Sequence, residues 1–457
     1  MQWLKLPEQV HFIGIGGAGM SALATVLLAL GYRVSGSDLV STPVTKRLEA
    51  LGGKCYVGHD RSNVQGARLV VISSAINPEN PELVAAKEMG IPVIHRAELL
   101  AWVLNRKKGI AVAGAHGKTT TTSMLALTLE KNGFDPTIII GGELNDIGGN
   151  AKLGQGEYVV AESDESDGSF LKLKPLAAIV TNIEDDHLDH YGSVENIKKA
   201  FKTFLSGIPA AGTAVVCLDD PNVREVAGSL NVPLVTYGLN SGADYTLKEI
   251  FLNGPHTGAD VYHGDRRLGT IELFVPGRHN LVNALGVVAL ARWLGLDFAR
   301  VAWALKDFRG VGRRFQFIGA AGGVRVFDDY AHHPTEIKAT LQAARTLGQK
   351  RVLAVFQPHR YTRTALLHER FGEAFGDADY IVMTDIYSAG EPPLEGVTTR
   401  LIIEAVEKRD GRQVVYCPAL EDAVEHLAGA VRPGDLVLTI GAGNVWKVGE
   451  MLLSRLR

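Results

Sequence analysis

Short runs of apolar residues recur along the chain, and each gives way to glycine or polar residues and then to a helical pattern. Because these runs are apolar at every position rather than alternating, they are typical of strands buried on both faces of a parallel sheet. Their alternation with helical segments predicts an α/β fold class. The predicted strands are 10–15, 33–38, 69–74, 91–94, 110–113, 136–140, 158–161, 177–181, 213–217, 233–237, 324–328, 352–356, 380–384, 414–416 and 436–439.

Polar breaks divide this pattern into three α/β units in series. A basic connector at 105–109 ends the first unit, and the glycine- and arginine-rich segment 310–314 ends the second. Within the second unit, residues 241–275 have the pattern of a β-meander with turns. At 457 residues the chain is too long for a single core. We therefore predict domains at 1–106, 107–312 and 313–457.

Composition narrows the class of protein without pointing to a function. The apolar content of 46% and the charged content of 21% are those of an ordinary globular protein, and a net charge of −3 gives no bulk attraction to nucleic acid or to an anionic membrane. Cys55, Cys217 and Cys417 are far apart and odd in number, so we expect neither a disulfide framework nor a cysteine zinc site. The first ten residues lack the pattern of a signal peptide, and no apolar run is long enough to span a bilayer. A cytoplasmic location is expected.

The most informative stretch is Gly114-Ala115-His116-Gly117-Lys118-Thr119, which follows an apolar run and opens a threonine-rich helix. Backbone N–H groups in such a glycine loop surround a phosphate, and the helix N-terminus adds a favourable dipole. Lys118 would neutralise the β- and γ-phosphates, and the Thr119 hydroxyl would bind Mg²⁺. The standard P-loop spacing would need glycine where the chain has Val112. An ordinary glycine turn with a solvated lysine is the alternative, but strand, glycines, lysine and threonine together favour a nucleotide-phosphate site.

A second glycine loop, Gly14-Ile15-Gly16-Gly17-Ala18-Gly19, follows the first predicted strand and is followed by Met20 and Ser21. The next strand ends in Asp38, which is the layout of a dinucleotide-binding βαβ unit. This pattern alone predicts only that a diphosphate binds at the helix end. A glycine turn that serves packing remains an alternative.

Polar residues follow several strands of the second unit, where the carboxyl ends of parallel strands line a ligand crevice. Lys118, Glu162 and His187 each come just after a separate predicted strand, so they would converge around one magnesium–nucleotide. Glu162 offers the carboxylate oxygen that Mg²⁺ prefers, whereas His187 offers a nitrogen. Solvated acidic loops are the alternative. The neighbouring acids are expected to be mostly solvated or to support the ligands, and they are Asp164, Glu165, Asp167 and Asp185.

The third unit carries weaker signals at its strand ends. Arg313 and Arg314 would reach a γ-phosphate or would be exposed linker charges. Segment 328–334 (DDYAHHP) offers an acid for a ribose or an ammonium and a histidine for acid–base work, and 357–360 (QPHR) offers another base and another guanidinium. The glycines at 441–443 are expected to serve packing. Together these features predict ATP-driven joining of a nucleotide-bearing substrate to a second molecule.

As an ordered set, the motifs resemble those of the Mur ligases, most closely of the alanine-adding branch: GIGGAGMS, GAHGKTTT, ESDESDGSF, TNIEDDHLDHY, GRHNLVNALG, GRRF, DDYAHHPTE and FQPHRYTR. The resemblance extends from about residue 10 to the C-terminus. It implies a Rossmann-like N-terminal domain, a central P-loop-type ATPase domain with a mixed sheet, and a C-terminal Rossmann-like α/β domain. One departure is Ala115, where this branch usually has threonine; Lys118 and Thr119 are retained.

The resemblance also implies roles for individual residues. The UDP-substrate site would comprise Gly14, Gly16, Gly17, Ala18, Gly19, Met20, Ser21, Asp38, Ser73 and Ser74. The ATP site would comprise Gly114, Ala115, His116, Gly117, Lys118, Thr119, Thr120, Asn280, Asn283, Arg314 and Asp329. Mg²⁺ would be held by Thr119, Glu162 and His187. The catalytic residues would be Lys118, Glu162, His187 and Arg314, with His332, His359 and Arg360 facing the amino acid and the acyl phosphate.

The implied reaction is ATP-dependent ligation of L-alanine to the lactyl carboxylate of UDP-N-acetylmuramate through an acyl phosphate, a step of peptidoglycan precursor synthesis. The implied partners are these three substrates, with no nucleic acid and no membrane, in a monomer or weak homodimer. Sister ligases use a carbamylated lysine, which is not expected here at Lys198, Lys199 or Lys202. The alternatives are a ligase that recycles a whole peptide, an NAD-dependent oxidoreductase built on the first glycine loop, and a nucleotide-gated binding module.

Overall fold

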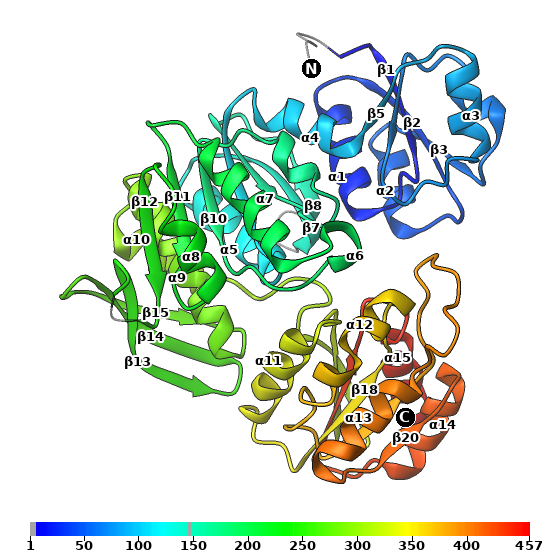
Figure 1. The fold of residues 1–457 in the computed structure, drawn as a ribbon, viewed down its shortest axis with the longest axis vertical. Helices are drawn as coiled ribbons and strands as arrows, with labels where there is room; N and C mark the ends of the chain where they lie inside the picture. Colours follow the sequence, from blue (N-terminus) through cyan, green and yellow to red (C-terminus); the bar gives the residue numbers. More distant parts are fainter. Residues whose placement is uncertain (1–5, 145–147, 241) are drawn as a thin grey trace. The chain divides into compact units, whose positions relative to one another are not determined.

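The described residues, 6–144, 148–240 and 242–457 of a computed structural model, form three sheets flanked by helices (Figure 1). The chain separates into two compact units. The first comprises 1–247, 261–269 and 283–305, and the second comprises 248–260, 270–282 and 306–457. Residues 1–5, at the start of the segment tested for a signal peptide, and residue 241, the first of the predicted meander, lie outside the described residues.

The first sheet is parallel throughout, with strand order β3-β2-β1-β4-β5. Its strands are β1 (Gln9–Ile13), β2 (Arg33–Asp38), β3 (Lys54–Val57), β4 (Leu69–Ile72) and β5 (Val93–His95). The helical segments are α1 (Ala18–Ala29), α2 (Pro43–Ala50), the short η1 (Arg61–Val64), α3 (Pro81–Glu88) and α4 (Arg96–Leu104). The chain adds strands first on one side of β1 and then on the other, and ligands bind at such a switch point in open α/β sheets.

The second sheet is mixed and has the order β15-β14-β13-β12-β11-β10-β6-β9-β7-β8. Its strands are β6 (Lys108–Ala113), β7 (Thr137–Leu144), β8 (Gly149–Lys152), β9 (Tyr158–Glu162), β10 (Ala177–Val180), β11 (Thr213–Cys217), β12 (Leu234–Gly238), β13 (Tyr245–Asn253), β14 (His256–His263) and β15 (Arg266–Leu273). The central strands pair in parallel, whereas β8 pairs antiparallel with β7. The helical segments are α5 (Lys118–Lys131), η3 (Ser169–Lys172), α6 (Leu188–Tyr191), α7 (Val194–Ser206), α8 (Pro221–Ala227), α9 (Arg278–Trp293) and α10 (Phe298–Leu305).

The third sheet has the order β16-β17-β21-β18-β19-β20, and only β16 pairs antiparallel with its neighbour. Its strands are β16 (Gln316–Ala321), β17 (Val324–Asp329), β18 (Arg351–Phe356), β19 (Tyr380–Met383), β20 (Val414–Tyr416) and β21 (Asp435–Ile440). The helices are α11 (Pro334–Arg345), α12 (Tyr361–Phe371), α13 (Arg400–Asp410), α14 (Leu420–Ala430) and α15 (Trp446–Leu456).

The α/β fold class predicted from the apolar runs is confirmed, because every predicted strand is present to within a few residues. Strand β10 is buried at all of its positions, as a run without alternation predicts. Strands β3, β8 and β16 were not predicted. The sequence of β8, GNAK, lacks a strand pattern, and it forms a strand because it pairs with β7 and packs against α1. Across the described ranges, no helix combines the length and the apolar character needed to cross a bilayer.

Candidate active site

The phosphate loop predicted at residues 114–119 joins β6 to α5, and its glycines are required by its geometry. Gly114 has φ +136°, and a Cβ there would lie 2.1 Å from Thr181 Oγ1. Gly117 has φ +80°, and a Cβ there would lie 3.0 Å from Asn283 Oδ1. No other residue type combines this backbone conformation with such close approach. Asn283, predicted for the ATP site, therefore lies directly against the loop.

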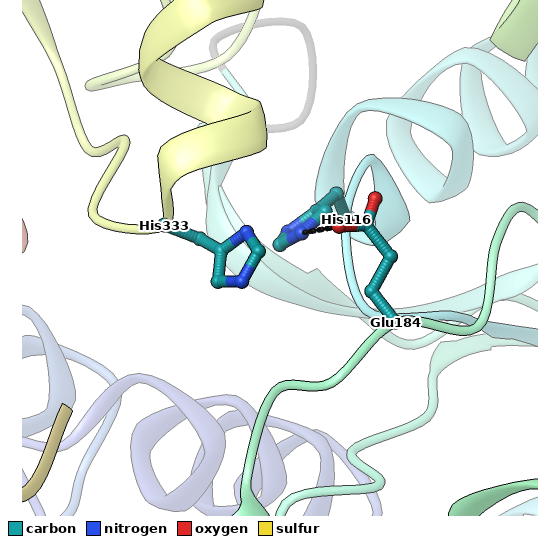
Figure 2. A group of neighbouring side chains, drawn as sticks. All are labelled: His116, Glu184 and His333. Atoms are coloured by element: carbon teal, nitrogen blue, oxygen red, sulfur yellow. Dashed lines mark ion pairs between the residues drawn. The ribbon is translucent and has the colours of Figure 1, made fainter. Parts of the chain in front are cut away.

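His116 holds the loop through its backbone as well as its ring. Its N–H donates to Asn182 Oδ1 at 2.8 Å, and its carbonyl accepts from Thr181 Oγ1 at 2.6 Å and from Asn182 Nδ2 at 3.1 Å. The ring Nε2 lies 3.6 Å from a carboxylate oxygen of Glu184, as Figure 2 shows. These contacts tie the loop to the segment after β10.

The Lys118 side chain curls back over its own loop. Its Nζ donates to the carbonyls of Gly114 at 2.6 Å and Ala115 at 3.0 Å, and it lies 2.8 Å from Glu165 Oε1. Burial opposes protonation of Lys118, but the carboxylates of Glu165, Asp164 and Glu162 outweigh it and raise the lysine pKa. The ammonium is therefore charged at neutral pH, at the centre of the loop.

Glu165 was expected to be mostly solvated or to support the ligands, and its side chain is not solvated. Its side chain is 3% exposed, and its Oε2 is buried without a hydrogen-bond partner. Burial, reinforced by the charge of Asp164, raises the pKa of Glu165 to about 7, although Lys118 opposes this effect. The carboxylates of Asp164 and Glu165 both interact with Lys118. Glu165 is the more buried of the two and has the higher pKa. Oε2 of Glu165 is therefore available to bind a positively charged ligand or a metal ion.

Three of the predicted nucleotide and metal residues come together beside Lys118. The Thr119 hydroxyl donates to Glu162 Oε1 at 3.0 Å, and the other oxygen of Glu162 accepts from the N–H of Gly141 at 2.8 Å. His187 precedes α6 with φ +59°, and its Nε2 lies 3.7 Å from Glu165 Oε1 and 3.5 Å from Asp186 Oδ2. The hydroxyl and carboxylate oxygens form a hard donor set that fits Mg²⁺.

The end of β2 holds the first glycine loop through hydrogen bonds. The N–H groups of Gly14 and Ile15 donate to the carbonyl of Ser37 at 2.8 and 2.9 Å, and the N–H of Gly16 donates to Asp38 Oδ2 at 2.8 Å. The Asp38 carboxylate thus fixes the loop itself. Gly17 precedes α1, where Ala18, Gly19, Met20 and Ser21 form the first turn; Met20 and Ser21 are buried.

Asn150 of β8 ties that first turn to the central sheet. Its amide nitrogen donates to the carbonyl of Ala18 at 2.8 Å and to Ser21 Oγ at 3.0 Å. The predicted Ser73 and Ser74 follow β4, where Ser74 Oγ donates to Asp167 and lies 3.1 Å from His95 Nε2. The residues predicted for the UDP-substrate site therefore lie around the carboxyl ends of β1, β2 and β4.

Arg96 connects the first glycine loop to the acidic segment 162–167 at the end of β9. It was not predicted from the sequence. Its guanidinium pairs with Asp164 of the acidic loop, and its Nη1 lies 3.1 Å from the position a Cβ would occupy at Gly19. Burial alone would raise the pKa of Asp164, but Arg96 and Lys118 outweigh it and lower that pKa. Arg96 directly follows β5, so the rule that ligand residues follow strands would have identified it.

In the second compact unit (248–260, 270–282 and 306–457), the predicted arginine pair contacts residues of the third sheet and its loops rather than lying exposed in a linker. Arg313 Nε donates to Asp328 at 3.0 Å, and its terminal nitrogens donate to the carbonyls of Gly441 at 2.8 Å and Gly443 at 3.2 Å. The packing role expected for the glycines at 441–443 agrees with this contact. Arg314 lies 3.7 Å from Glu336 and over the Tyr330 ring.

Asp329 is one of the buried acids of this unit. It accepts from the backbone N–H groups of Phe315 and Ala331, both at 2.8 Å. Burial raises the pKa of Asp329 to about 6 against the opposing charge of Arg314. Asn280, also predicted for ATP, donates its amide N–H to the carbonyl of Pro276 at 2.7 Å.

His332, His359 and Arg360 lie together at the carboxyl ends of β17 and β18. The two imidazole rings are 5.8 Å apart, and His359 stacks on Tyr387 at 5.7 Å. Arg360 has φ +71°, a strained conformation for a non-glycine residue, and lies 3.8 Å from Glu391. Tyr387 was not predicted, since it lies in a loop after β19 without a recognisable motif.

Lys198, weighed as a carbamylation position, forms ion pairs with Glu195 at 2.6 Å and Glu225 at 2.8 Å.

Comparison with known proteins identifies the family. Family models described as "Mur ligase family, catalytic domain", "Mur ligase middle domain" and "Mur ligase, glutamate ligase domain" match residues 9–108, 112–291 and 313–443. The chain is 60% identical over 451 residues to a UDP-N-acetylmuramate–L-alanine ligase of Pelotomaculum thermopropionicum, with 98% of each chain covered. It is 58% identical to the ligase of the same name from Desulforamulus reducens, covering 100% of this chain and 99% of the relative.

Solved structures show the same architecture. The UDP-N-acetylmuramate-alanine ligase of Thermotoga maritima superposes with a TM-score of 0.84 at 32% identity, covering 98% of each chain. A murein peptide ligase from Psychrobacter arcticus superposes with a TM-score of 0.76 at 25% identity, covering 98% of this chain and 99% of that chain. With all three family models matched in order and relatives aligned along their whole length, this chain belongs to the Mur ligase family.

Proposed function

We propose that this chain is an enzyme that joins L-alanine to the lactyl carboxylate of UDP-N-acetylmuramate, converting ATP to ADP and phosphate. The observation that carries the proposal is the phosphate loop, in which Lys118 and the Thr119–Glu162 pair meet beside a buried, unsatisfied carboxylate oxygen of Glu165. Relatives at 50–60% identity over nearly the whole chain carry the alanine-ligase name, which argues against an oxidoreductase and against a binding module.

The recycling alternative is less well supported. The alanine ligase of Thermotoga maritima has higher identity (32% against 25%) and a higher TM-score (0.84 against 0.76) than the murein peptide ligase. We therefore propose L-alanine, and not a preformed peptide, as the incoming amine.

In the first step, the lactyl carboxylate attacks the γ-phosphate of ATP and forms an acyl phosphate with release of ADP. A carboxylate is a poor acyl donor, and phosphorylation turns one of its oxygens into a good leaving group. Lys118 would move from the carbonyls of its own loop to the β- and γ-phosphates, where its charge is needed as the phosphoryl group transfers. The backbone N–H groups around Gly114 and Gly117 would orient the same phosphates.

Thr119 and Glu162 would hold Mg²⁺, with His187 as a third ligand. When bound, the ion would neutralise charge on the phosphate oxygens. Glu162 is already oriented by Thr119 and by the N–H of Gly141, so the donor atoms need little rearrangement.

In the second step, the amine of L-alanine attacks the carbonyl of the acyl phosphate and expels phosphate. We assign the UDP end of the substrate to the glycine loop after β1, and the amino acid to the neighbourhood of His332, His359 and Arg360. Asn280, Asn283, Arg314 and Asp329 complete the proposed ATP site. The functional boundaries proposed are 1–106 for the UDP-substrate domain, 107–312 for the ATPase domain and 313–457 for the last domain. The cellular role that follows is cytoplasmic synthesis of a peptidoglycan precursor, and hence support of cell shape and division, by a monomer or weak homodimer.

The direct test supplies purified protein with ATP, Mg²⁺, UDP-N-acetylmuramate and either L-alanine or the tripeptide, and measures ADP release and the mass of the product. We expect L-alanine alone to support turnover and to yield UDP-N-acetylmuramoyl-L-alanine. Turnover with the tripeptide only would establish the recycling alternative. Nicotinamide reduction without ATP turnover would establish the oxidoreductase, and ATP binding without phosphate release would indicate a binding module.

A further inference from the structure

A fully buried carboxylate outside the phosphate sites connects two strands of the first sheet with two of the helical segments that pack beside it. Glu82 of α3 has no exposed side-chain surface. Its Oε2 accepts from Ser37 Oγ at 2.5 Å and lies 3.3 Å from His11 Nε2. Its Oε1 accepts from Asn63 Nδ2 at 2.6 Å and from the N–H of Asp60 at 3.3 Å. Glu82 therefore joins β1, β2, η1 and α3 at one point.

This network is complete and holds a charge. Burial alone would raise the pKa of Glu82, but the hydrogen bonds from His11, Ser37 and Asn63 outweigh it and lower the pKa. His59 extends the network, since its Nδ1 lies 3.0 Å from Ser37 Oγ. An ionised carboxylate without exposed surface is costly to bury, and replacing such a network by apolar residues often leaves stability unchanged or improved. A role in stability alone therefore gives little reason for its presence.

Ser37 connects the network to the glycine loop. While its hydroxyl donates to Glu82, its carbonyl accepts the N–H groups of Gly14 and Ile15. The next residue, Asp38, accepts the N–H of Gly16 through its carboxylate. Three consecutive N–H groups of the loop are thus held by two residues of β2, and Glu82 fixes the first of these two.

We infer that Glu82 is a positioning residue for the UDP-substrate site: through Ser37 it holds the backbone of Gly14, Ile15 and Gly16 in the conformation that receives the diphosphate. This inference rests on the proposed function for the assignment of the diphosphate to this loop. The hydrogen bonds of Glu82 to described residues all lie within the first sheet and its helices, so we expect its influence to be confined to one substrate.

The test uses the full-length protein and two variants that weaken the same connection, Glu82→Gln and Ser37→Ala. Leu83→Ala is the matched control, because Leu83 neighbours Glu82 on α3, is 4% exposed and packs in the core without any polar contact in the network. Calorimetric titrations give the affinity for UDP-N-acetylmuramate and, separately, for magnesium–ATP. Thermal unfolding gives the stability of each variant.

We expect Glu82→Gln and Ser37→Ala each to weaken UDP-N-acetylmuramate binding about tenfold while magnesium–ATP affinity stays within about twofold. Combining them should weaken binding by less than the product of the two effects, because both act on one connection. Leu83→Ala should lower the unfolding temperature and leave both affinities unchanged. Unchanged binding in Ser37→Ala, or equal loss of both affinities in step with stability, would overturn the inference. A wild-type protein that binds magnesium–ATP but not UDP-N-acetylmuramate would overturn the proposed function and this inference with it.

Discussion

Lys118 and Glu165 form a buried ion pair in which Nζ lies 2.8 Å from Oε1, and the same ammonium also donates to the carbonyls of Gly114 and Ala115. The lysine proposed to bind phosphate therefore has its three donors satisfied by the protein. Incoming phosphates would replace the two carbonyls, whereas Glu165 would keep the ammonium at the mouth of the loop.

Lys118→Ala should abolish turnover and leave UDP-N-acetylmuramate binding nearly intact. The loss of charge at the transferring phosphoryl group should reduce kcat on the order of a thousandfold. Steady-state ADP release and calorimetric titration with the UDP-substrate measure the two effects. Lys108→Ala, which removes an exposed ion pair between Lys108 at the start of β6 and Glu157, is the matched control and should retain activity. Equal loss of turnover and of UDP-substrate binding would place this loop in a different role.

Removing the Thr119 hydroxyl should raise the requirement for Mg²⁺. Thr119→Val keeps the shape of the side chain but cannot donate to Glu162 or bind the ion, so the half-saturating Mg²⁺ concentration should rise about tenfold. Thr119→Ser keeps the hydroxyl and should remain close to wild type. The measurement is ADP release over a magnesium titration at saturating ATP, and identical Mg²⁺ dependence in the valine and serine variants would contradict the metal assignment.

Gly114→Ala should damage the loop more than a comparable glycine substitution elsewhere. Both Gly114, at φ +136°, and Gly133, at φ +78°, have positive φ, but only at Gly114 does a Cβ meet a neighbour, Thr181 Oγ1 at 2.1 Å. Backbone strain should cost about 1–3 kcal/mol of unfolding free energy in either variant. Gly114→Ala should in addition lose ATP turnover because the loop must move. Retention of full activity would show that the observed loop conformation is not the active one.

The strand pattern predicted the α/β fold, because buried strands and glycine turns are local features of the sequence. The position of β8 was not predictable, since its pairing with β7 and packing on α1 are tertiary contacts. In the candidate site, Lys118, Thr119 and Glu162 were predicted because each follows a strand in a recognisable motif. Arg96 follows β5 but belongs to no recognisable motif. Glu82 lies on α3, where the sequence gives no sign that its side chain is buried in a polar network. For Glu165, solvation and support of the ligands both stayed open, since its burial depends on packing that the sequence does not display.

Asp329 should make stability depend on pH in the acidic range. Its pKa is about 6 in the folded chain against 3.8 ordinarily, so the folded state holds a proton that the unfolded chain releases between these values. Stability from this group is therefore lost as the pH rises from about 4 to about 6. Asp329→Asn cannot titrate, so the unfolding free energy of wild type minus that of the variant should be about 2 kcal/mol larger at pH 4 than at pH 7. Urea denaturation at both pH values measures this difference, and a value independent of pH would contradict the raised pKa of the buried Asp329.

The most direct test traces the two oxygen atoms of the lactyl carboxylate. UDP-N-acetylmuramate labelled with ¹⁸O in both oxygens of its lactyl carboxylate is converted with unlabelled ATP and L-alanine, and the released phosphate is analysed by mass spectrometry. If the carboxylate attacks the γ-phosphate and the amine then expels phosphate, each released phosphate should carry a single ¹⁸O, and the amide product should keep the other. Unlabelled phosphate, or label in AMP, would contradict the proposed chemistry at Lys118 and Thr119.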